Sequence, residues 1–446
     1  MCLGCNKICY SLYFAIQSYS RASNAGELSN AVGSGVQKYM GVGREVGGMT
    51  AELRTDVNRP HVPTDGTTIT AEIDVEPGPK QQHVQRHIAL CIDTSGSMGG
   101  TKIQRARDGA SWVFGLLADD DYVSVVAFDA DAEQIMAPTR WGDIDRDEAM
   151  AAVAELTAGG STNLFEGLQS AQSALASLGS QDDATIVRRL LLLSDGKDKH
   201  NEPSAFEELA REIDESGIRI ESAGIGQDYN EDTIRTLGTT ARGEWTHLDG
   251  PGDIEDFFGD AVEEANSVVA PDAQLALDAA HGVEISDVYR ALPQAQDVAL
   301  DWQDNTAVVK LPDLTEREHQ RVVMKVYVPE AESEQEAVDL VDVTLTARGG
   351  EARGSISVTY TDDADKLAEN NTDVQLDHQQ TVIQTELGKG NVQNAETQIE
   401  QMTRIHGEDT EIVKEVQRQT ELVKEGGRAE RNQATKIVSD DEGVQK

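Results

Sequence analysis

Positively charged and aromatic side chains are scarce in this chain of 446 residues. Lys and Arg total 38 against 80 Asp and Glu, which gives a formal net charge of −42, and aromatic residues make up only 4%. Because no basic face is available to neutralise phosphates, we expect no nucleic acid partner. The acidic residues are scattered along the whole chain, and their mutual repulsion is largely screened only near about 1 M salt. This composition predicts a cytoplasmic protein of a halophilic archaeon.

Cysteine and long apolar runs are also scarce. Three of the four cysteines crowd the first nine residues without a fourth ligand nearby, which disfavours a metal site there, whereas Cys91 lies in an apolar run. The apolar stretch 8–16 is broken by polar residues and is shorter than the ~20 residues that a transmembrane helix needs. It also lacks the features of a secretion signal, so we expect no transmembrane segment and a cytoplasmic location. We expect residues 1–40 to be a disordered extension, or the product of a start codon upstream of the true one at Met40 or Met49.

Alternating β patterns flank a central segment of different periodicity. Met49–Val57 and Thr67–Val75 alternate apolar and polar residues before it, and the segments between Ala273 and Tyr360 return to that alternation. We therefore expect one antiparallel β-sandwich into which the central domain is inserted. The predicted parts are an extension (1–40), the first sandwich strands (41–85), the central domain (86–268), the remaining sandwich strands (269–362), a helical hairpin (363–425) and a disordered tail (426–446).

The central domain alternates strand and helix patterns. Ile88–Ile92 and Leu190–Leu193 are continuous apolar runs, as buried parallel strands show, and Ile103–Leu117 carries apolar residues at helical spacing. Repeated units of this kind predict the α/β class, with a doubly wound, mostly parallel, Rossmann-like sheet and helices on both faces. In the predicted hairpin, an apolar stripe from Val392 to Ile405 follows a preceding helix and the loop 388–390.

Polar side chains follow two of the buried strands. The segment 93–97 comes directly after the first strand, 194–196 follows the second, and 159–163 precedes a helix. In an open α/β sheet, ligands bind outside the carboxyl ends of the strands, so these segments are expected to converge. Taken alone, each segment could be a helix cap or a turn. Together they offer carboxylates and hydroxyls, which are the hard ligands that Mg²⁺ or Mn²⁺ prefers.

In this respect the sequence resembles the von Willebrand factor A family, over about residues 87–267. All five positions of that family's metal-ion-dependent adhesion site are matched, by Asp93, Ser95, Ser97, Thr162 and Asp195. The resemblance implies a doubly wound sheet with a divalent ion at its top. It also implies that the two serines ligate directly, the threonine directly or through water, and the two aspartates mainly through bound waters. An open position on the ion would then take an Asp or Glu carboxylate from a protein partner.

Several neighbouring residues leave more than one interpretation open. Asp129 and Asp131 follow a strand and are expected to form a solvated acidic loop, with extra charge for the metal site as the alternative. Lys197, Asp198 and His200 follow the second segment, and they are either partner contacts or ordinary surface residues.

The resemblance implies a metal-dependent protein-binding module, working as an adaptor or assembly factor. Some prokaryotic members of the family act beside AAA+ ATPases, which makes an AAA+ ATPase one candidate partner. A cell-surface adhesion protein is an alternative, but it would need an export signal or anchor. A metal-dependent hydrolase is a further alternative. It would need a general base beside the metal, and none of the Gly-x-Ser-x-Gly, His-Glu-x-x-His or P-loop patterns occurs, so we expect no enzymatic activity.

Overall fold

The computed structural model describes residues 41–42, 44–47, 51–80, 83–178, 185–198, 200–226, 229–248, 253–298, 300–347, 350–426 and 434. The chain divides by its contacts into two units, Met1–Lys38 and Tyr39–Lys446, and every described residue belongs to the second. The extension predicted at residues 1–40 lies outside the described residues. The same holds for the tail predicted at 426–446, except for Gly426 and Ala434.

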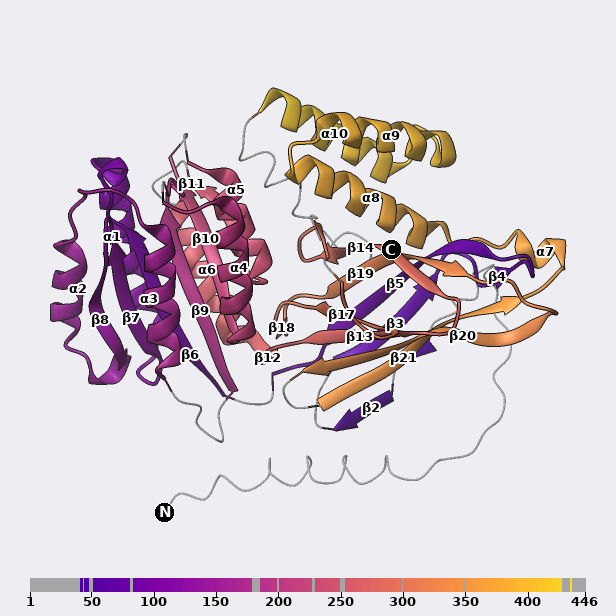
Figure 1. The fold of residues 1–446 in the computed structure, drawn as a ribbon, viewed down its shortest axis with the longest axis horizontal. Coiled ribbons are helices and arrows are strands. Elements are labelled where there is room, and N and C mark those ends of the chain that lie inside the picture. The colour runs from indigo at the N-terminus through magenta and orange to yellow at the C-terminus, as the bar shows by residue number, and fades with distance from the viewer. Residues whose placement is uncertain are drawn as a thin grey trace, which may run out of the picture. The chain divides into compact units, whose positions relative to one another are not determined.

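A six-stranded sheet forms the centre of the α/β domain (Figure 1). Its strand order is β11-β10-β9-β6-β7-β8, and all neighbouring strands are parallel except β7 and β8. The strands are β6 (Val84–Asp93), β7 (Tyr122–Phe128), β8 (Ala132–Arg140), β9 (Thr185–Ser194), β10 (Ile218–Ile225) and β11 (Trp245–Leu248). This arrangement confirms the predicted doubly wound, mostly parallel sheet.

Helices cover both faces of this sheet, so that an apolar core lies on each face. One apolar core joins the sheet to α1 (Thr101–Leu116), α2 (Arg146–Ala154) and α6 (Asp253–Ser267). The other core joins it to α3 (Leu164–Ala176), α4 (Pro203–Glu215) and α5 (Glu231–Thr240). Successive side chains of a strand point to opposite faces, so β6 contributes Ile88, Leu90 and Ile92 to the first core and Ala89 and Cys91 to the second. The apolar runs seen in the sequence are continuous for this reason.

Two further sheets form the sandwich, and both contain strands from before and after the α/β domain. Their orders are β1-β3-β5-β19-β14-β15 and β16-β17-β13-β20-β21-β2, with β4 parallel to β21 and a separate β12–β18 pair. The strands before the domain are β1 (Gly41–Val42), β2 (Arg44–Gly47), β3 (Ala51–Val57), β4 (His61–Val62) and β5 (Thr67–Pro77). Those after it are β12 (Val268–Ala270), β13 (Gln274–Ala279), β14 (Glu284–Leu292), β15 (Gln296–Asp297), β16 (Asp301–Gln303), β17 (Thr306–Lys310), β18 (Leu314–Thr315), β19 (Gln320–Val328), β20 (Gln335–Ala347) and β21 (Gly350–Tyr360).

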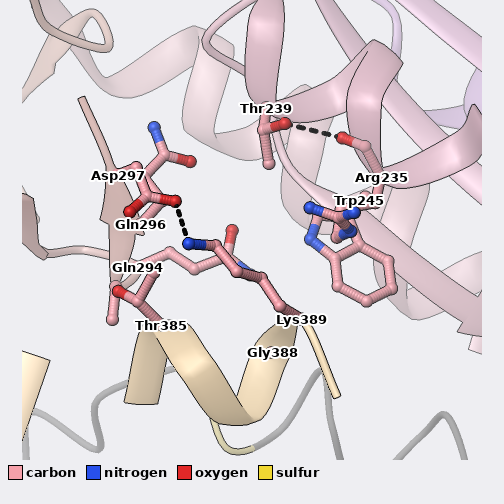
Figure 2. Close-up of a pocket in the computed structure, with 10 residues that line it drawn as sticks. Arg235, Thr239, Trp245, Gln294, Gln296, Asp297, Thr385, Gly388 and Lys389 are labelled. Atoms are coloured by element: carbon pink, nitrogen blue, oxygen red, sulfur yellow. Dashed lines mark hydrogen bonds and ion pairs between the residues drawn. The ribbon is translucent and has the colours of Figure 1, made fainter. Parts of the chain in front are cut away.

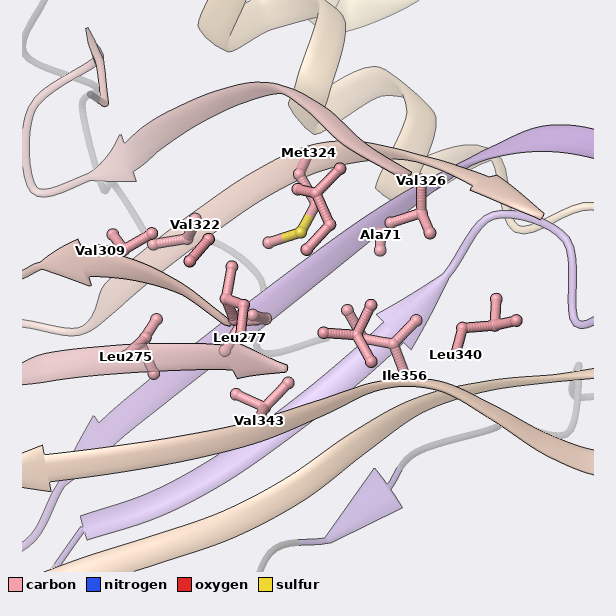
Figure 3. Close-up of a cluster of buried hydrophobic side chains, with 14 of the residues drawn as sticks. Ala71, Leu275, Leu277, Val309, Val322, Met324, Val326, Leu340, Val343 and Ile356 are labelled. Carbon is pink, nitrogen blue, oxygen red and sulfur yellow. The ribbon is translucent and has the colours of Figure 1, made fainter. Parts of the chain in front are cut away.

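The pairing of β5 with β19 closes the sandwich around the insertion. The two strands are antiparallel and remain in register from Thr67 opposite Val328 to Val75 opposite Gln320. Buried side chains of the two sheets interdigitate in one apolar core (Figure 3), where Met324 of the first sheet and Leu277 and Ile356 of the second are labelled. The α/β domain is therefore inserted into the sandwich, as the sequence predicted.

The C-terminal helices form an apolar core of their own. The predicted hairpin is made by α8 (Thr372–Gly388) and α9 (Val392–His406), and a third helix, α10 (Glu411–Glu425), packs against both. The short α7 (Ala364–Leu367) precedes them. Helix α8 contacts β5, β14, β15 and β19 of the first sandwich sheet. Among the described residues, no helix combines the length and apolar character needed to cross a bilayer.

Candidate metal site

The two aspartates of the predicted site lie at the ends of adjacent strands. Asp93 is the last residue of β6, and Asp195 directly follows the end of β9. These strands are parallel neighbours, with Ile92 opposite Leu193, so both carboxylates emerge at the same edge of the sheet. Both residues are 0% exposed. Two carboxylates that are fully buried from solvent require polar or charged partners.

Asp93 is fixed by hydrogen bonds to both of its carboxylate oxygens. The N–H of Ser95 donates to Oδ1 (2.8 Å), and the hydroxyl of Ser194 donates to Oδ2 (2.7 Å). The Ser194 Oγ in turn accepts from the N–H of Gly196 (2.9 Å). Burial raises the pKa of Asp93, the hydrogen bonds from Ser95 and Ser194 oppose that rise, and the charge of Asp195 adds to it. Sequence reasoning gave Ser194 no role beyond a turn, although it precedes a proposed ligand.

Ser95 and Ser97 present their hydroxyls together. Their Oγ atoms lie 3.0 Å apart at the start of a short 3₁₀ turn, η1 (Gly96–Met98). Ser95 is buried, whereas Ser97 is exposed. Met98 is fully buried in the apolar core under the turn, and its N–H donates to the carbonyl of Ser95 (2.9 Å). An apolar anchor thus holds the turn that carries the two hydroxyls.

The loop that carries Thr162 is tied to the same turn by backbone hydrogen bonds. The N–H of Gly96 donates to the carbonyl of Gly160 (3.2 Å), and the N–H of Gly159 donates to the carbonyl of Thr94 (2.8 Å). Thr162 is half-buried. The structure therefore brings all three predicted segments to one edge of the sheet.

Asp129 is bound to this loop more closely than the sequence suggested. The N–H of Asn163 donates to the carbonyl of Asp129 (2.6 Å), and the Asp129 carboxylate accepts from the N–H of Ala130 and, at 3.4 Å, from that of Asp131. Asp131 is exposed, as expected of a solvated acidic loop, but Asp129 is half-buried and shapes the loop.

Two lysines flank the carboxylate of Asp195. The Nζ atoms of Lys102 and Lys197 lie 3.5 Å and 3.7 Å from its Oδ2. The N–H of Lys197 also donates to Oδ1 (3.3 Å). The sequence left the role of Lys197 open. It gave no role to Lys102, because no local sequence pattern shows that the second residue of α1 approaches Asp195 at the end of β9.

The donor set fits a hard divalent ion. In the described part of the chain, no cluster of three or more His, Cys, Asp or Glu side chains could hold a metal. A metal at this edge would therefore depend on the hydroxyls of Ser95, Ser97 and Thr162 in addition to two carboxylates. Such an all-oxygen set suits Mg²⁺ or Mn²⁺ and disfavours thiophilic metals.

A cavity elsewhere in the structure lies apart from this site (Figure 2). Helix α5 begins beside Asp195, but the cavity is lined by Arg235 and Thr239 further along that helix. Its other walls include Asp297 and Lys389, whose carboxylate and ammonium groups lie 2.5 Å apart. The volume is about 90 Å³. Its lining contains none of the five predicted metal ligands.

Parts of the sequence match a known family and known proteins. Residues 87–259 match the family model of the von Willebrand factor type A domain. The chain is 22% identical over 357 residues to the uncharacterized protein sll0103 of Synechocystis sp., covering 76% of this chain and 82% of that protein. It is 27% identical over 195 residues to inter-alpha-trypsin inhibitor heavy chain H4 of Sus scrofa, covering 42% of this chain but only 21% of that protein.

Solved structures share the fold over most of the chain. A von Willebrand factor type A protein from Catenulispora acidiphila superposes with a TM-score of 0.72 at 20% identity, covering 89% of this chain and 99% of that one. The ArnB paralog VWA2 from Sulfolobus acidocaldarius gives a TM-score of 0.59 at 17% identity, with 87% and 97% covered. Both likenesses extend beyond the α/β domain to the flanking parts. The central α/β domain of this chain is therefore a von Willebrand factor type A domain.

Proposed function

We propose that this protein is a divalent-metal-dependent binding module that captures an acidic residue of a protein partner. One observation carries the proposal: the buried carboxylates of Asp93 and Asp195 end adjacent strands beside the paired hydroxyls of Ser95 and Ser97. The Thr162 loop is hydrogen-bonded to the same turn through Gly96 and Gly160. By the resemblance to the von Willebrand factor A family, these residues would supply the full donor set of a metal-ion-dependent adhesion site.

Each residue has a separate role in the proposed site. A bound Mg²⁺ or Mn²⁺ would supply an electrophilic position for an anionic oxygen. Ser95, Ser97 and Thr162 would ligate it with neutral oxygens, which leaves most of its charge for an incoming ligand. Asp93 and Asp195 would act mainly through bound waters. The hydrogen bonds of Asp93 to Ser95 and Ser194 keep its carboxylate in place, which favours a preorganised site.

The proposal includes no covalent chemistry. In the part of the chain that the structure describes, no histidine or cysteine contributes to the contacts that hold the five ligands together. We further propose a cytoplasmic adaptor or assembly factor of a halophile, with an AAA+ ATPase as one partner class. The acidic composition and the buried free thiol of Cys91 support the halophilic, cytoplasmic part of this proposal. The adaptor role and the ATPase rest on the resemblance to prokaryotic members of the von Willebrand factor A family.

Calorimetry with Mg²⁺ and Mn²⁺ in high-salt buffer tests the proposal. We expect the wild-type protein to bind metal, Thr162→Ala to bind at least about tenfold more weakly, and the Asp93→Ala, Ser95→Ala double variant not to bind. Thr157→Ala is the matched control, because Thr157 is exposed near the same loop and should bind like wild type. Equal affinities for the Thr157 and Thr162 variants would overturn the assigned ligands. Metal binding that the variants lose would justify a metal-dependent pull-down for the partner.

A further inference from the structure

A small cavity lies where three parts of the fold meet (Figure 2). Its walls include Arg235 and Trp245 of the α/β domain, Gln296 and Asp297 of the sandwich, and Thr385 and Lys389 at the end of α8. The volume of about 90 Å³ is far below the ~300–1,000 Å³ of pockets for drug-sized ligands. Any ligand of this cavity is therefore a molecule of only a few non-hydrogen atoms.

Two oxygen atoms in these walls have no hydrogen-bond partner among the residues that the structure describes. They are Oγ1 of Thr385, a residue that is 4% exposed, and Oε1 of Gln296. The hydroxyl of Thr381, one turn earlier on α8, donates instead to the carbonyl of Asp377 (2.6 Å). Buried polar groups are rarely left unpaired, because they lose their bonds to water on folding. Since the amide oxygen of Gln296 can only accept, a ligand that satisfies both groups must carry a hydrogen-bond donor.

Arg235 is the cation in these walls that can receive an anionic group. In the described residues its one ion pair is with Asp232 on the same helix (3.2 Å), and the Asp232 side chain is 88% exposed. So exposed a pair is weak, and it uses only one of the five N–H groups of the guanidinium. The ammonium of Lys389 is instead bound by two carboxylates, those of Asp297 (2.5 Å) and Glu386 (3.3 Å). A ligand carboxylate would therefore find its partner at Arg235.

Figure 2 shows these groups on opposite sides of the cavity, with Gln296 and Thr385 on one side and Arg235 and Trp245 on the other. We propose that the cavity binds a small carboxylate that carries a hydroxyl or amino group on the neighbouring carbon. Its carboxylate would accept two parallel N–H bonds from Arg235, and its hydroxyl or amino group would donate to Gln296 and bond to the hydroxyl of Thr385. The ring of Trp245 would cover its apolar side. None of the five proposed metal ligands lines the cavity, so this site is separate from the proposed partner-binding function.

Calorimetry with four small molecules tests the ligand class. L-Lactate has a carboxylate and a neighbouring hydroxyl, L-alanine has a carboxylate and a neighbouring ammonium, propionate lacks the donor, and glycerol lacks the carboxylate. We expect L-lactate or L-alanine, whichever matches the natural ligand, to bind at least about tenfold more tightly than propionate and glycerol. The KCl concentration is the lowest at which circular dichroism shows an intact fold, because salt screens the charge of Arg235.

Substitutions on the two sides of the cavity locate the binding. Thr385→Val removes the hydroxyl and should weaken binding of the preferred probe at least about tenfold, whereas Thr385→Ser keeps the hydroxyl and should bind within about threefold of wild type. Arg235→Gln should also weaken binding at least about tenfold, because the carboxylate loses its cation. Thr397→Val and Arg404→Gln are the matched controls, because they remove the same groups from exposed positions on α9. Both controls should bind like wild type.

The probes and the variants can each contradict the proposal. Absence of binding by both L-lactate and L-alanine would overturn the site. Propionate that binds as tightly as either would overturn the role of Gln296 and Thr385, and glycerol that does so would overturn the role of Arg235. Binding of the preferred probe that survives in both Thr385→Val and Arg235→Gln would place the ligand outside this cavity. Arg235 is partly exposed on α5, so Arg235→Gln remains a test if Thr385→Val does not fold.

Discussion

Arg189 and Asp313 form a buried ion pair between the α/β domain and the sandwich. Nη1 of Arg189, on β9, lies 2.8 Å from Oδ2 of Asp313, which stands between β17 and β18. Their side chains are 1% and 5% exposed. Burial alone would raise the pKa of Asp313, but Arg189, Arg219 and Arg242 outweigh it and hold the pKa at about 2. The inserted domain is thus joined to the sandwich by charges in addition to its two chain connections.

We expect Asp313→Ala to lower the free energy of unfolding by about 3–5 kcal/mol, because it removes one acid from a buried ion-pair network and leaves Arg189 with Glu221 as its remaining acidic partner. Urea denaturation at a fixed salt concentration measures the change. Asp301→Ala is the matched control, because Asp301 is exposed on β16, and its effect should stay within about 0.5 kcal/mol. Equal small effects of the two substitutions would show that the pair does not join the domains.

The buried side chain of Glu72 on β5 is expected to make the free energy of unfolding depend on pH. Burial raises its pKa to about 8, with Arg321 opposing the rise, whereas an unfolded glutamate has a pKa of about 4.3. Because the folded-state pKa is the higher one, the folded protein binds the extra proton between these values, and stability falls as pH rises from about 4.3 to about 8. Glu72→Gln should therefore raise the free energy of unfolding by about 1–3 kcal/mol near pH 8.5 and leave it unchanged near pH 4.

Urea denaturation of Glu72→Gln at both pH values checks this, with Glu76→Gln as the control. Glu76 lies on the same strand, is partly exposed and pairs with Arg54 at 3.2 Å. A stabilisation of Glu72→Gln that is the same at both pH values would show that an ionised, buried Glu72 is not its cause.

Much of the fold could be predicted because its signals are local. The continuous apolar runs at Ile88–Ile92 and Leu190–Leu193 belong to strands covered on both faces, so burial alone marks them. Asp93 and Asp195 could be placed at one edge because the carboxyl ends of parallel strands meet there. The sandwich could be predicted from the alternating apolar and polar residues on both sides of the α/β domain. These inferences need no knowledge of contacts distant in sequence.

Other features depend on contacts that the sequence pattern does not reveal. Strand β8 was not predicted, since it contains Pro138 and lies at the sheet edge with much of its length exposed, and only its antiparallel pairing with β7 defines it. Helix α10 extends the predicted hairpin by packing on α8 and α9. The approach of Lys102 to Asp195 depends on the shape of the chain at Gly226, far along the sequence from both.

The net charge of −42 predicts stability that rises with salt. From about 0.1 M to about 1 M KCl, the Debye length shortens from ~10 Å to ~3 Å, which screens repulsion among exposed acids. We expect the melting temperature at neutral pH to rise by several degrees over this range, as measured by circular dichroism. Sucrose is the control, since it favours compact states without screening charge. A melting temperature independent of KCl, or raised as much by sucrose, would contradict the halophilic interpretation of the composition.

Gly160 and Gly159 are adjacent, but the structure predicts opposite outcomes for the same substitution. Gly160 has a φ of +71°, and a Cβ there would lie 2.6 Å from Oδ2 of Asp129, whereas nothing lies within 4 Å of a Cβ at Gly159. We expect Gly160→Ala to cost about 1–3 kcal/mol of stability, because alanine disfavours this backbone and displaces the Asp129 carboxylate. It should also weaken Mn²⁺ binding, since Thr162 is only two residues away. Denaturation and calorimetry should find Gly159→Ala close to wild type, and equal behaviour of the two variants would mean that this loop does not shape the site.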